Sequence, residues 1–453
     1  MKTIEPLSFY GIERNLKFYL ISCGSGLTHL IIFPDDTAML FDCNLVEDTS
    51  LAGGWDSEQI LNFFKKVIPK KKNKYGTCFQ SIDIFVNSHR DTDHLKGLKE
   101  INSQFPIQSI WDSGCAGENP NNDEYKYYMG LRQRIAAKDK NNIKVPLPTN
   151  TCIKEFDGAK IYCLADAKDY RESIGLEAFS ESCDKKQHTN CMVLLITYAG
   201  RKMLLTGDSG WEAWKDKIVP NFKGKADSYE NTDIMIASHH GSRSFFTSAE
   251  TINEEKNPDN TFTEHIKQIK PKITLISCGN YDYKDYHLPN DEAVKLYKKY
   301  TSNEQVYTTY NKGTFCGQIK SDGSFSVAPY RFYNKNNING HRIKIVCYDD
   351  ENNKIENNSS CHIHKNLRFK VINDIGSLLS SFDSIIVIWE VCNSGYGKDS
   401  AHHEIYKKDK DEPEDSFSFK RELSYVGTHL LRCYVKNQIK GDQICVFIIN
   451  GIE

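Results

Sequence analysis

Two imidazoles and two carboxylates are crowded into one short stretch of this chain. His89, Asp91, Asp93 and His94 follow directly after an apolar, β-rich run. On an ordinary surface these side chains would repel one another or stay unused, whereas two divalent cations roughly 3.5–4 Å apart would satisfy all four. The alternative is an exposed polar loop with two accidental histidines. The types and spacing of these residues therefore predict a metal-binding loop.

Buried strands are expected to hold this loop and three later groups of polar side chains. Residues 81–86, Ser-Ile-Asp-Ile-Phe-Val, have the β-branched and aromatic composition of a core strand. The same order of strand and polar side chains recurs at Met203–Leu205 before Asp208, at Asp233–Ser238 before His239 and His240, and at Ile273–Cys278 before His287. A carboxylate placed like Asp208 can bridge two metals with one oxygen on each. We therefore expect the later segments to complete the site.

The first ninety residues have the pattern of an α/β sandwich. Apolar runs at residues 18–23, 30–33 and 39–43, separated by turn residues, predict successive antiparallel strands. Asp42, at the end of the third run, would either support the metal loop from behind or only cap a turn. A helix is expected over residues 56–67, where apolar residues recur at helical spacing.

Length and composition indicate a soluble protein of two or three domains. The chain has 453 residues, a hydrophobic content of 39% and a formal net charge of -2. No run approaches the roughly 20 apolar residues that span a bilayer, and residues 1–13 lack a secretory signal, so we expect a cytoplasmic protein without a membrane partner. The 15 cysteines stand in apolar contexts without a CxxC pair, which favours buried reduced thiols. The near-neutral charge argues against a surface that clamps nucleic acid throughout.

Four of these segments together resemble the metallo-β-lactamase fold. The segments are His89–His94, Leu205–Asp208, His239–Ser242 and His287–Pro289, in the order seen in that superfamily. They look like its competence-protein (ComEC-like) branch, which has aspartate at the position of Asp91 where the commoner HxHxDH motif has its second histidine. Residues 308–324 are similar to the closing strands of that branch, so the likeness covers roughly residues 17–328. It implies an αββα sandwich with two divalent ions, Zn²⁺ or Mn²⁺, at one edge, and phosphodiesterase or nuclease activity.

The resemblance also implies a role for each residue. It assigns one metal to His89 and Asp91, the other to Asp93 and His94, the bridge to Asp208, and the rest of the shell to His239, His240 or both. His287 would ligate a metal or protonate the leaving oxygen, and Asp93 would also orient the nucleophile, so Asp93, Asp208 and His287 are the expected catalytic residues. Where many relatives place a further histidine, this chain has His188-Thr189-Asn190, and His188 would either serve there or be merely solvated. An oxygen-rich shell suits Mn²⁺ rather than Zn²⁺, and both ions stay open.

A second domain is expected after the first 330 residues. Residues 331–341 are Asn-rich and apolar-poor, which is typical of a linker. In residues 342–453 short apolar runs at 343–348, 367–371, 385–391, 430–435 and 444–449 alternate with polar turns. This spacing predicts a smaller all-β sandwich of immunoglobulin type with Trp389 at its centre.

The last 75 residues or so resemble a known sensor domain. The segments Trp389–Gly395 and Tyr425–His429, followed by a terminal strand, look like the adenylyl/guanylyl-cyclase and SMODS C-terminal sensor domain, a family proposed to sense nucleotide signals in prokaryotic conflict systems. Polar positions of that family are matched by Asn393, Arg421, Glu422, Tyr425 and His429. These side chains would contact a ligand, or they would form a structural network like a tyrosine corner.

The leading hypothesis is a metal-dependent phosphodiesterase or nuclease that acts as an effector in prokaryotic antiviral defence. Its substrate would be a nucleic acid or a nucleotide, and its C-terminal domain would respond to a nucleotide signal or a partner protein. Two alternatives are a hydrolase of esters, thioesters or lactams, because this fold also cleaves such bonds, and a degenerate metal-bound binding protein. The intact acidic and histidine positions weigh against the last of these.

Overall fold

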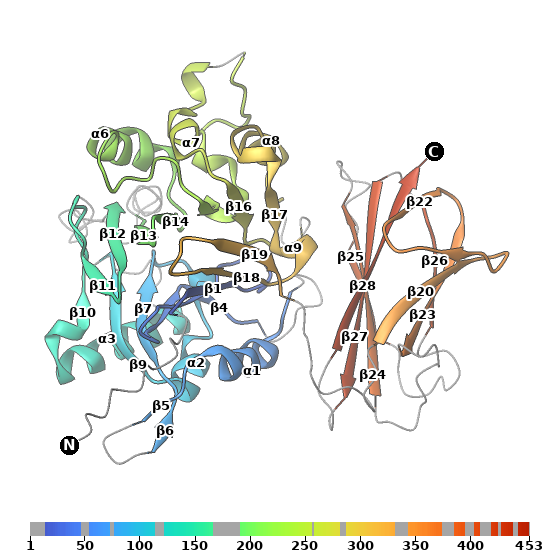
Figure 1. Cartoon of the computed structure of the whole chain (residues 1–453), viewed down its shortest axis with the longest axis horizontal. Helices are drawn as coiled ribbons and strands as arrows, with labels where there is room; N and C mark the ends of the chain where they lie inside the picture. The colour runs from blue at the N-terminus through green and yellow to red at the C-terminus, as the bar shows by residue number, and fades with distance from the viewer. Residues whose placement is uncertain are drawn as a thin grey trace, which may run out of the picture. The chain divides into compact units, whose positions relative to one another are not determined.

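The chain divides into two compact units, Met1–Pro329 and Tyr330–Glu453. The computed structural model describes residues 14–46, 54–72, 77–113, 122–165, 191–255, 258–280, 287–330, 343–373, 385–394, 403–407, 418–424, 427–437 and 443–452, which are drawn in colour in Figure 1. The predicted linker, residues 331–341, lies outside these ranges. Each unit is considered by itself.

Two sheets form the centre of the first unit. Within the described residues, one sheet has eight strands in the order β10-β9-β7-β3-β2-β1-β18-β19 and the other has seven, β11-β12-β13-β14-β15-β16-β17. The first contains β1 (Leu16–Leu20), β2 (His29–Ile32), β3 (Ala38–Phe41), β7 (Ile82–Asn87), β9 (Ile107–Asp112), β10 (Ile143–Lys144), β18 (Phe315–Ile319) and β19 (Phe325–Pro329). The second contains β11 (Lys154–Phe156), β12 (Ala159–Ala165), β13 (Val193–Tyr198), β14 (Arg201–Leu205), β15 (Ile234–Ile236), β16 (Ile273–Ile276) and β17 (Val306–Thr308).

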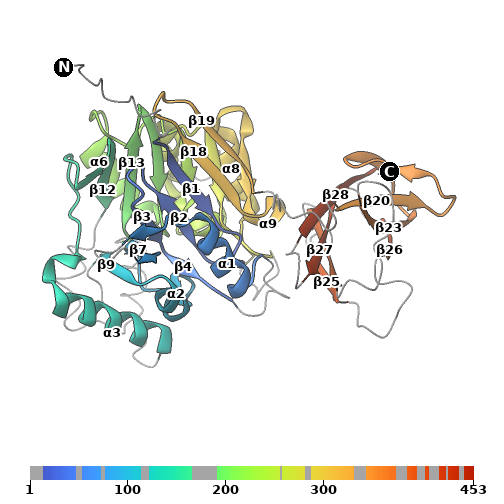
Figure 2. The ribbon, with the colours of Figure 1, turned by 60° about the horizontal axis from the view of Figure 1, so that its bottom comes forward.

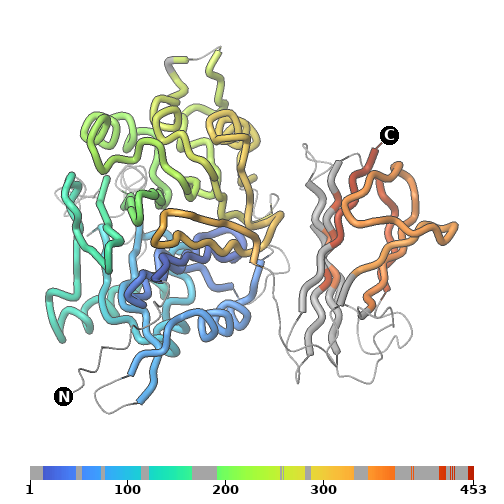
Figure 3. The backbone as a smooth tube through the Cα atoms, in the orientation of Figure 1, coloured from blue at the N-terminus to red at the C-terminus, as the bar shows by residue number. Residues whose placement is uncertain are grey.

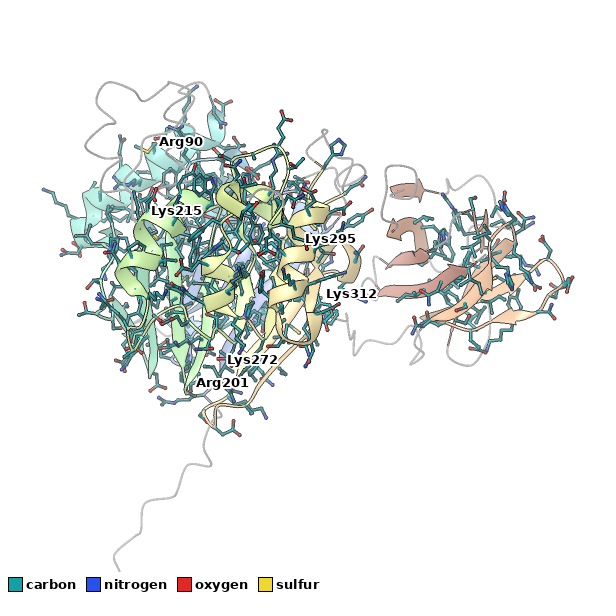
Figure 4. The ribbon with its side chains drawn as sticks, turned by 90° about the horizontal axis from the view of Figure 1, so that it is seen from above. Arg90, Arg201, Lys215, Lys272, Lys295 and Lys312 are labelled. Carbon is teal, nitrogen blue, oxygen red and sulfur yellow. The ribbon has the colours of Figure 1, made fainter. Side chains whose placement is uncertain are left out.

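The directions of the strands bring several of their carboxyl ends to one edge. The strands β1, β2 and β3 are antiparallel, as predicted, and β13 and β14 form the predicted hairpin. In contrast, β3, β7 and β9 run parallel to one another, and so do β14, β15, β16 and β17. Figure 4 shows Arg90, beyond the end of β7, on one side of the unit, and Arg201 and Lys272, at the starts of β14 and β16, on the opposite side. Polar residues that follow these parallel strands therefore gather at one edge of each sheet.

Apolar side chains fill both faces of the second sheet. Met203 and Leu205 of β14 belong to a core cluster shared with strands of the first sheet, such as Phe18 and Met39. The intervening Leu204 instead packs with helical residues on the outer face. A strand buried on both faces has apolar side chains at successive positions, which explains the continuous run Met-Leu-Leu.

Helices cover the outer faces of the two sheets (Figures 1 and 2). They are α1 (Ser57–Val67), α2 (Leu98–Gln104) and α3 (Asp123–Lys138), then the π-helix η3 (Ala213–Ile218) with α6 (Val219–Phe222), α7 (Glu264–Ile269), α8 (Asp291–Tyr300) and α9 (Thr309–Lys312). Helix α1 begins with a capping box between Asp56 and Gln59, as its sequence favours, and buries Phe63 against Tyr19 of β1. On the other sheet Trp214, Ile266 and others pack over Leu204. The predicted αββα sandwich is confirmed.

Short elements complete the first unit. They are β4 (Cys43–Asn44), β5 (Lys71–Lys72), β6 (Cys78–Phe79), β8 (Leu95–Lys96), and the 3₁₀ turns η1 (Thr92–His94), η2 (Lys140–Asn142), η4 (Ser238–Gly241), η5 (Arg243–Phe245), η6 (Pro258–Asn260) and η8 (Ser302–Glu304). Cysteines of the described residues are free thiols, and Cys43, Cys163, Cys191 and Cys278 are among the buried ones. In the part of the chain that is described, no helix is long and apolar enough to cross a membrane.

The second unit is an all-β sandwich, and this prediction is also confirmed (Figure 1). Figure 3 traces the backbone alone. Its described strands form the sheets β21-β20-β23-β26 and β22-β28-β27-β24-β25. They are β20 (Ile343–Asp349), β21 (Lys354–Ile355), β22 (Ser359–His362), β23 (Asn366–Asn373), β24 (Ile385–Ser394), β25 (His403–Lys407), β26 (Ser418–Glu422), β27 (Gly427–Asn437) and β28 (Gln443–Ile452). The predicted core residue Trp389 is fully buried and its ring stacks on Phe419 at 5.7 Å. Strands β21, β22, β25 and β26 were not predicted.

Candidate metal centre

Four histidine rings face one buried carboxylate at the carboxyl edge of the sandwich. Asp208 follows β14, and its Oδ1 lies 3.3 Å from Nε2 of His94. Its Oδ2 lies 3.6 Å from Nε2 of His239, 3.7 Å from that of His89 and 3.8 Å from that of His240. Asp208 is nearly inaccessible to solvent, with its side chain 3% exposed. The ends of β7, β14 and β15 thus bring ligand-type atoms from both sheets to one point.

A second carboxylate lies beside this group. Asp93 Oδ2 is 3.2 Å from Nε2 of His240 and 3.8 Å from Nε2 of His94. Two sets of potential ligand atoms, each within 4.8 Å of one another, result: His89, His94 and Asp208, and Asp93, His94 and His240. Asp91 Oδ2 lies 3.2 Å from Nε2 of His89. The seven residues predicted to bind metal are therefore neighbours in space, and His94 belongs to both sets.

The predicted catalytic His287 lies outside both sets, within the described residues. It starts a segment that packs on the turn carrying His239 and His240, because the N–H of Asn290 donates to Gly241 O at 3.0 Å. Gly241 has a φ of +81°, and a Cβ atom there would come within 2.6 Å of Pro289. Glycine is therefore required at this close approach.

Asp42 holds the ligand loop from behind. Its Oδ1 accepts the N–H of Ser88 at 2.7 Å, and its Oδ2 accepts the hydroxyl of Ser88 at 2.6 Å. The same Oδ2 lies 2.7 Å from Nδ1 of His94. Asp42 thus does more than cap a turn, because it orients the ring of His94, and carboxylates hold metal-binding histidines in the same way.

The partners at Nδ1 decide which ring nitrogen carries the proton in each neutral histidine. His94 Nδ1 faces a carboxylate, and His240 Nδ1 faces the carbonyl oxygen of Ser277 at 3.0 Å, so both must donate. The hydroxyl of Ser88 already donates to Asp42, and therefore accepts from Nδ1 of His89 at 3.0 Å. In the neutral rings the three Nε2 atoms consequently carry the lone pairs, and they face carboxylate oxygens.

The charges at this edge are strongly coupled. Burial alone would lower the pKa of His94, but Asp208, Asp42 and Asp93 outweigh it and raise that pKa well above its ordinary value. Burial would raise the pKa of Asp208, but the surrounding histidines, His94 first, hold it well below its usual range. The same competition, in which Asp208 and Asp93 outweigh burial, raises the pKa of His240. Without another cation, protonated imidazoles must balance these carboxylates.

These donors fit a divalent ion. Nε2 of His94 and Oδ1 of Asp208 are buried, and among the described residues neither makes a hydrogen bond, although they lie only 3.3 Å apart. A buried lone pair that faces a carboxylate oxygen is unfavourable unless a proton or a metal lies between them. Neutral imidazole nitrogen and carboxylate oxygen are the ligands that Zn²⁺ and Mn²⁺ bind.

Comparisons with known proteins found only weak structural similarity. No protein-family model matches the chain, and no curated protein matches it. Among solved structures it is similar to Igni18, a novel metallo hydrolase from the hyperthermophilic archaeon Ignicoccus hospitalis KIN4/I, with a TM-score of 0.36 and 12% identity over 70% of this chain and 100% of that one. It is also similar to the PmoD soluble domain from Methylocystis sp. ATCC 49242 (Rockwell), with a TM-score of 0.17 and 10% identity over 24% of this chain and 90% of that one. At these scores neither likeness adds to what the geometry of the site itself indicates.

Four non-glycine residues at this edge have left-handed backbone conformations, as do ten others among the described residues. Asp42, His239, His240 and His287 have φ values of 58°, 49°, 54° and 47°. Such a conformation costs a non-glycine residue about 1–3 kcal/mol and is commonest where function requires it. The strain therefore agrees with a functional site at these residues.

Several supporting residues were not found from the sequence. Ser277 fixes the His240 ring, Ser244 Oγ lies 2.9 Å from Nδ1 of His239, and Cys191 Sγ accepts the N–H of Asp208 at 3.1 Å. Ser88 directly precedes the predicted ligand His89, so its supporting role could have been inferred from the sequence. Cys191 and Ser277 lie far from the ligands in sequence, and no local pattern marks them.

Three of the five predicted sensing residues meet in the second unit. Arg421, Glu422 and His429 line a cavity whose other walls are apolar, among them Phe369 and Phe447. Its volume is about 30 Å³, room on the order of one or two water molecules.

The remaining sequence-predicted positions are less fully described. Asn393 pairs with His429 across β24 and β27, although only its backbone is described. Tyr425 of the second unit lies outside the described residues, and so does His188 of the first.

Proposed function

We propose that the chain is a metal-dependent hydrolase that cleaves phosphodiester bonds in a nucleic acid or a nucleotide. The observation that carries this proposal is the convergence of four Nε2 atoms on the buried carboxylate of Asp208. A structural ion pair needs one partner for each charge. Four rings around one carboxylate, with two further carboxylates beside them, instead match the shell of one or two divalent ions.

Phosphodiester chemistry is favoured by the charge of the ligand set. Asp91, Asp93 and Asp208 contribute three carboxylates, and oxygen ligands suit the harder cations that act on phosphates. Bound divalent ions would neutralise phosphate oxygens and lower the pKa of an attacking water. The net charge of -2 is more in keeping with a small nucleotide than with a long polymer.

The protein's own residues would divide the remaining work. Asp93 is the most exposed of the three carboxylates, with its side chain 41% exposed against 24% for Asp91 and 3% for Asp208. Its Oδ2 could therefore orient a water that enters from solvent. His287 would give a proton to the leaving oxygen. The segment that His287 starts packs on Gly241 and so lies at this edge.

The second unit would regulate this activity, and an effector role in prokaryotic antiviral defence would follow. Arg421, Glu422 and His429 around one cavity support a recognition site. Because the cavity is far smaller than a nucleotide, a nucleotide signal would have to open it, whereas a partner protein could contact its rim as it stands.

Cleavage assays test the proposal directly. The purified full-length chain with Mn²⁺ or Zn²⁺ should cleave at least one of plasmid DNA, single-stranded DNA, RNA and cyclic nucleotides, and Asp208→Ala should abolish cleavage. The control is Asp233→Asn, because Asp233 is a buried carboxylate before β15, ion-paired to Arg201 and Lys272 at the opposite edge. If no phosphodiester is cut under either metal, with or without added nucleotides, the proposal fails, and esters, thioesters and lactams become the substrates to test.

A further inference from the structure

A buried thiol lies directly behind two of the candidate ligands. Cys191 precedes β13, is fully buried, and its Sγ accepts the backbone N–H of Asp208 at 3.1 Å. The same sulfur lies 3.9 Å from Nδ1 of His89. One side chain therefore contacts both the ligand loop after β7 and the turn after β14.

The backbone beside this thiol strengthens the connection. The N–H of Met192 donates to the carbonyl oxygen of Ser88 at 2.9 Å, so residues 191–192 bond the ligand loop and the Asp208 turn at once. Ser88 in turn holds the ring of His89 through its hydroxyl. A displacement of this segment would therefore move His89 and Asp208 relative to each other.

The space around the sulfur is closely filled. Gly207 has a φ of +51°, and a Cβ atom there would lie 2.5 Å from the sulfur of Cys191 and 3.0 Å from Cβ of Ser88. The turn can approach the thiol this closely only because residue 207 lacks a side chain. The size of the side chain at position 191 thus helps to set where the backbone of Asp208 lies.

We propose that Cys191 is a positioning residue that sets the separation between His89 and Asp208 and so tunes metal affinity. It acts through the N–H···S hydrogen bond to Asp208 and through its contact with the His89 ring. The inference depends on the proposed function in one respect, that His89 and Asp208 are metal ligands. Groups that orient metal ligands typically contribute about 10- to 100-fold in affinity.

The experiment compares three variants of the full-length chain by titration with Co²⁺, read by its absorption bands, and with Zn²⁺, read by calorimetry. Cys191→Ala removes the acceptor and should weaken binding of both ions about 10- to 100-fold and shift the Co²⁺ bands. Cys191→Ser keeps an acceptor on a shorter bond, and should recover part of the affinity. The control Cys163→Ala removes a buried thiol from β12 of the same sheet, and should leave both readouts unchanged.

The outcomes separate positioning from simple filling of space. If Cys191→Ala binds both ions like the wild type, with unchanged Co²⁺ bands, the proposal is overturned, whatever the loss in thermal stability. If the alanine variant does not fold, a fourth variant, Cys191→Val, decides, because it fills the space without an acceptor, and wild-type bands and affinity in that variant would equally overturn the proposal. A wild-type chain that binds metal but cleaves no phosphodiester refutes the proposed activity and leaves this test intact, whereas one that binds no metal refutes both.

Discussion

Replacing Asp208 with asparagine should remove most of the metal affinity of the site. The substitution keeps the shape of the side chain and deletes the one charge that four imidazole nitrogens face at 3.3–3.8 Å. A single positive charge held at the 3.3 Å that separates His94 Nε2 from the carboxylate would be attracted by about 5 kcal/mol at an effective dielectric constant of about 20, which is a lower bound for a divalent ion. Because about 1.4 kcal/mol corresponds to a factor of ten, this is more than a thousandfold in an equilibrium constant. The other donors remain in place and keep part of the binding energy, so we expect metal affinity to fall by about 100- to 1,000-fold.

Calorimetric titration with Zn²⁺ and Mn²⁺ measures this loss, and elemental analysis of the dialysed protein gives the number of bound ions. Asp233→Asn serves as the control, because it removes a buried carboxylate of the same sheet whose ion pairs are at the opposite edge. The control should bind both ions like the wild type. If Asp208→Asn retains wild-type affinity, Asp208 is not at the centre of a metal site, and the four rings around it need another explanation.

Four further results are expected. Asp42→Asn replaces the charged acceptor behind His94 with a neutral amide, and should weaken metal binding about 10- to 100-fold in the same titration; wild-type affinity would show that Asp42 only supports the turn. Metal binding should release protons, because His94 and His240 have raised pKa values in the metal-free protein. Metal affinity should therefore fall as the pH falls. Calorimetry in buffers of different ionisation enthalpy counts the released protons. The pKa of His94 is raised in the folded, metal-free protein, so the protonated ring stabilises that protein fully below about pH 6.5, and this stabilisation is lost as the pH rises through the higher pKa. Thermal unfolding at a series of pH values detects the loss. A metal-free protein that gains stability as the pH rises would contradict this prediction. Trp389→Ala should destabilise the second unit by about 3–5 kcal/mol, measured by urea unfolding of the full-length chain, and should leave metal affinity unchanged.

Local patterns in the sequence were sufficient to predict the strands that hold the candidate ligands. Apolar runs of strand length precede His89, Asp208 and His239, and β7, β14 and β15 lie where those runs do. Strand composition reflects burial on one or both faces, which is a local property, so element type and ligand type could both be read residue by residue. In the second unit the buried position of Trp389 followed from the same periodicity.

Only the tertiary structure decided which of the candidate ligands face one another. The ligand loop that contains Asp91 was predicted from four neighbouring residues, but the position of His94 between Asp208 and Asp93 depends on how two sheets pack and where their parallel strands end. The support from Asp42 and Cys191 depends on the same packing, because Asp42 lies 52 residues from His94 and Cys191 lies 102 residues from His89 in the sequence. Residue types and strand periodicity determined that a metal-binding edge was expected, whereas long-range packing determined the distances, charges and proton positions on which its chemistry depends.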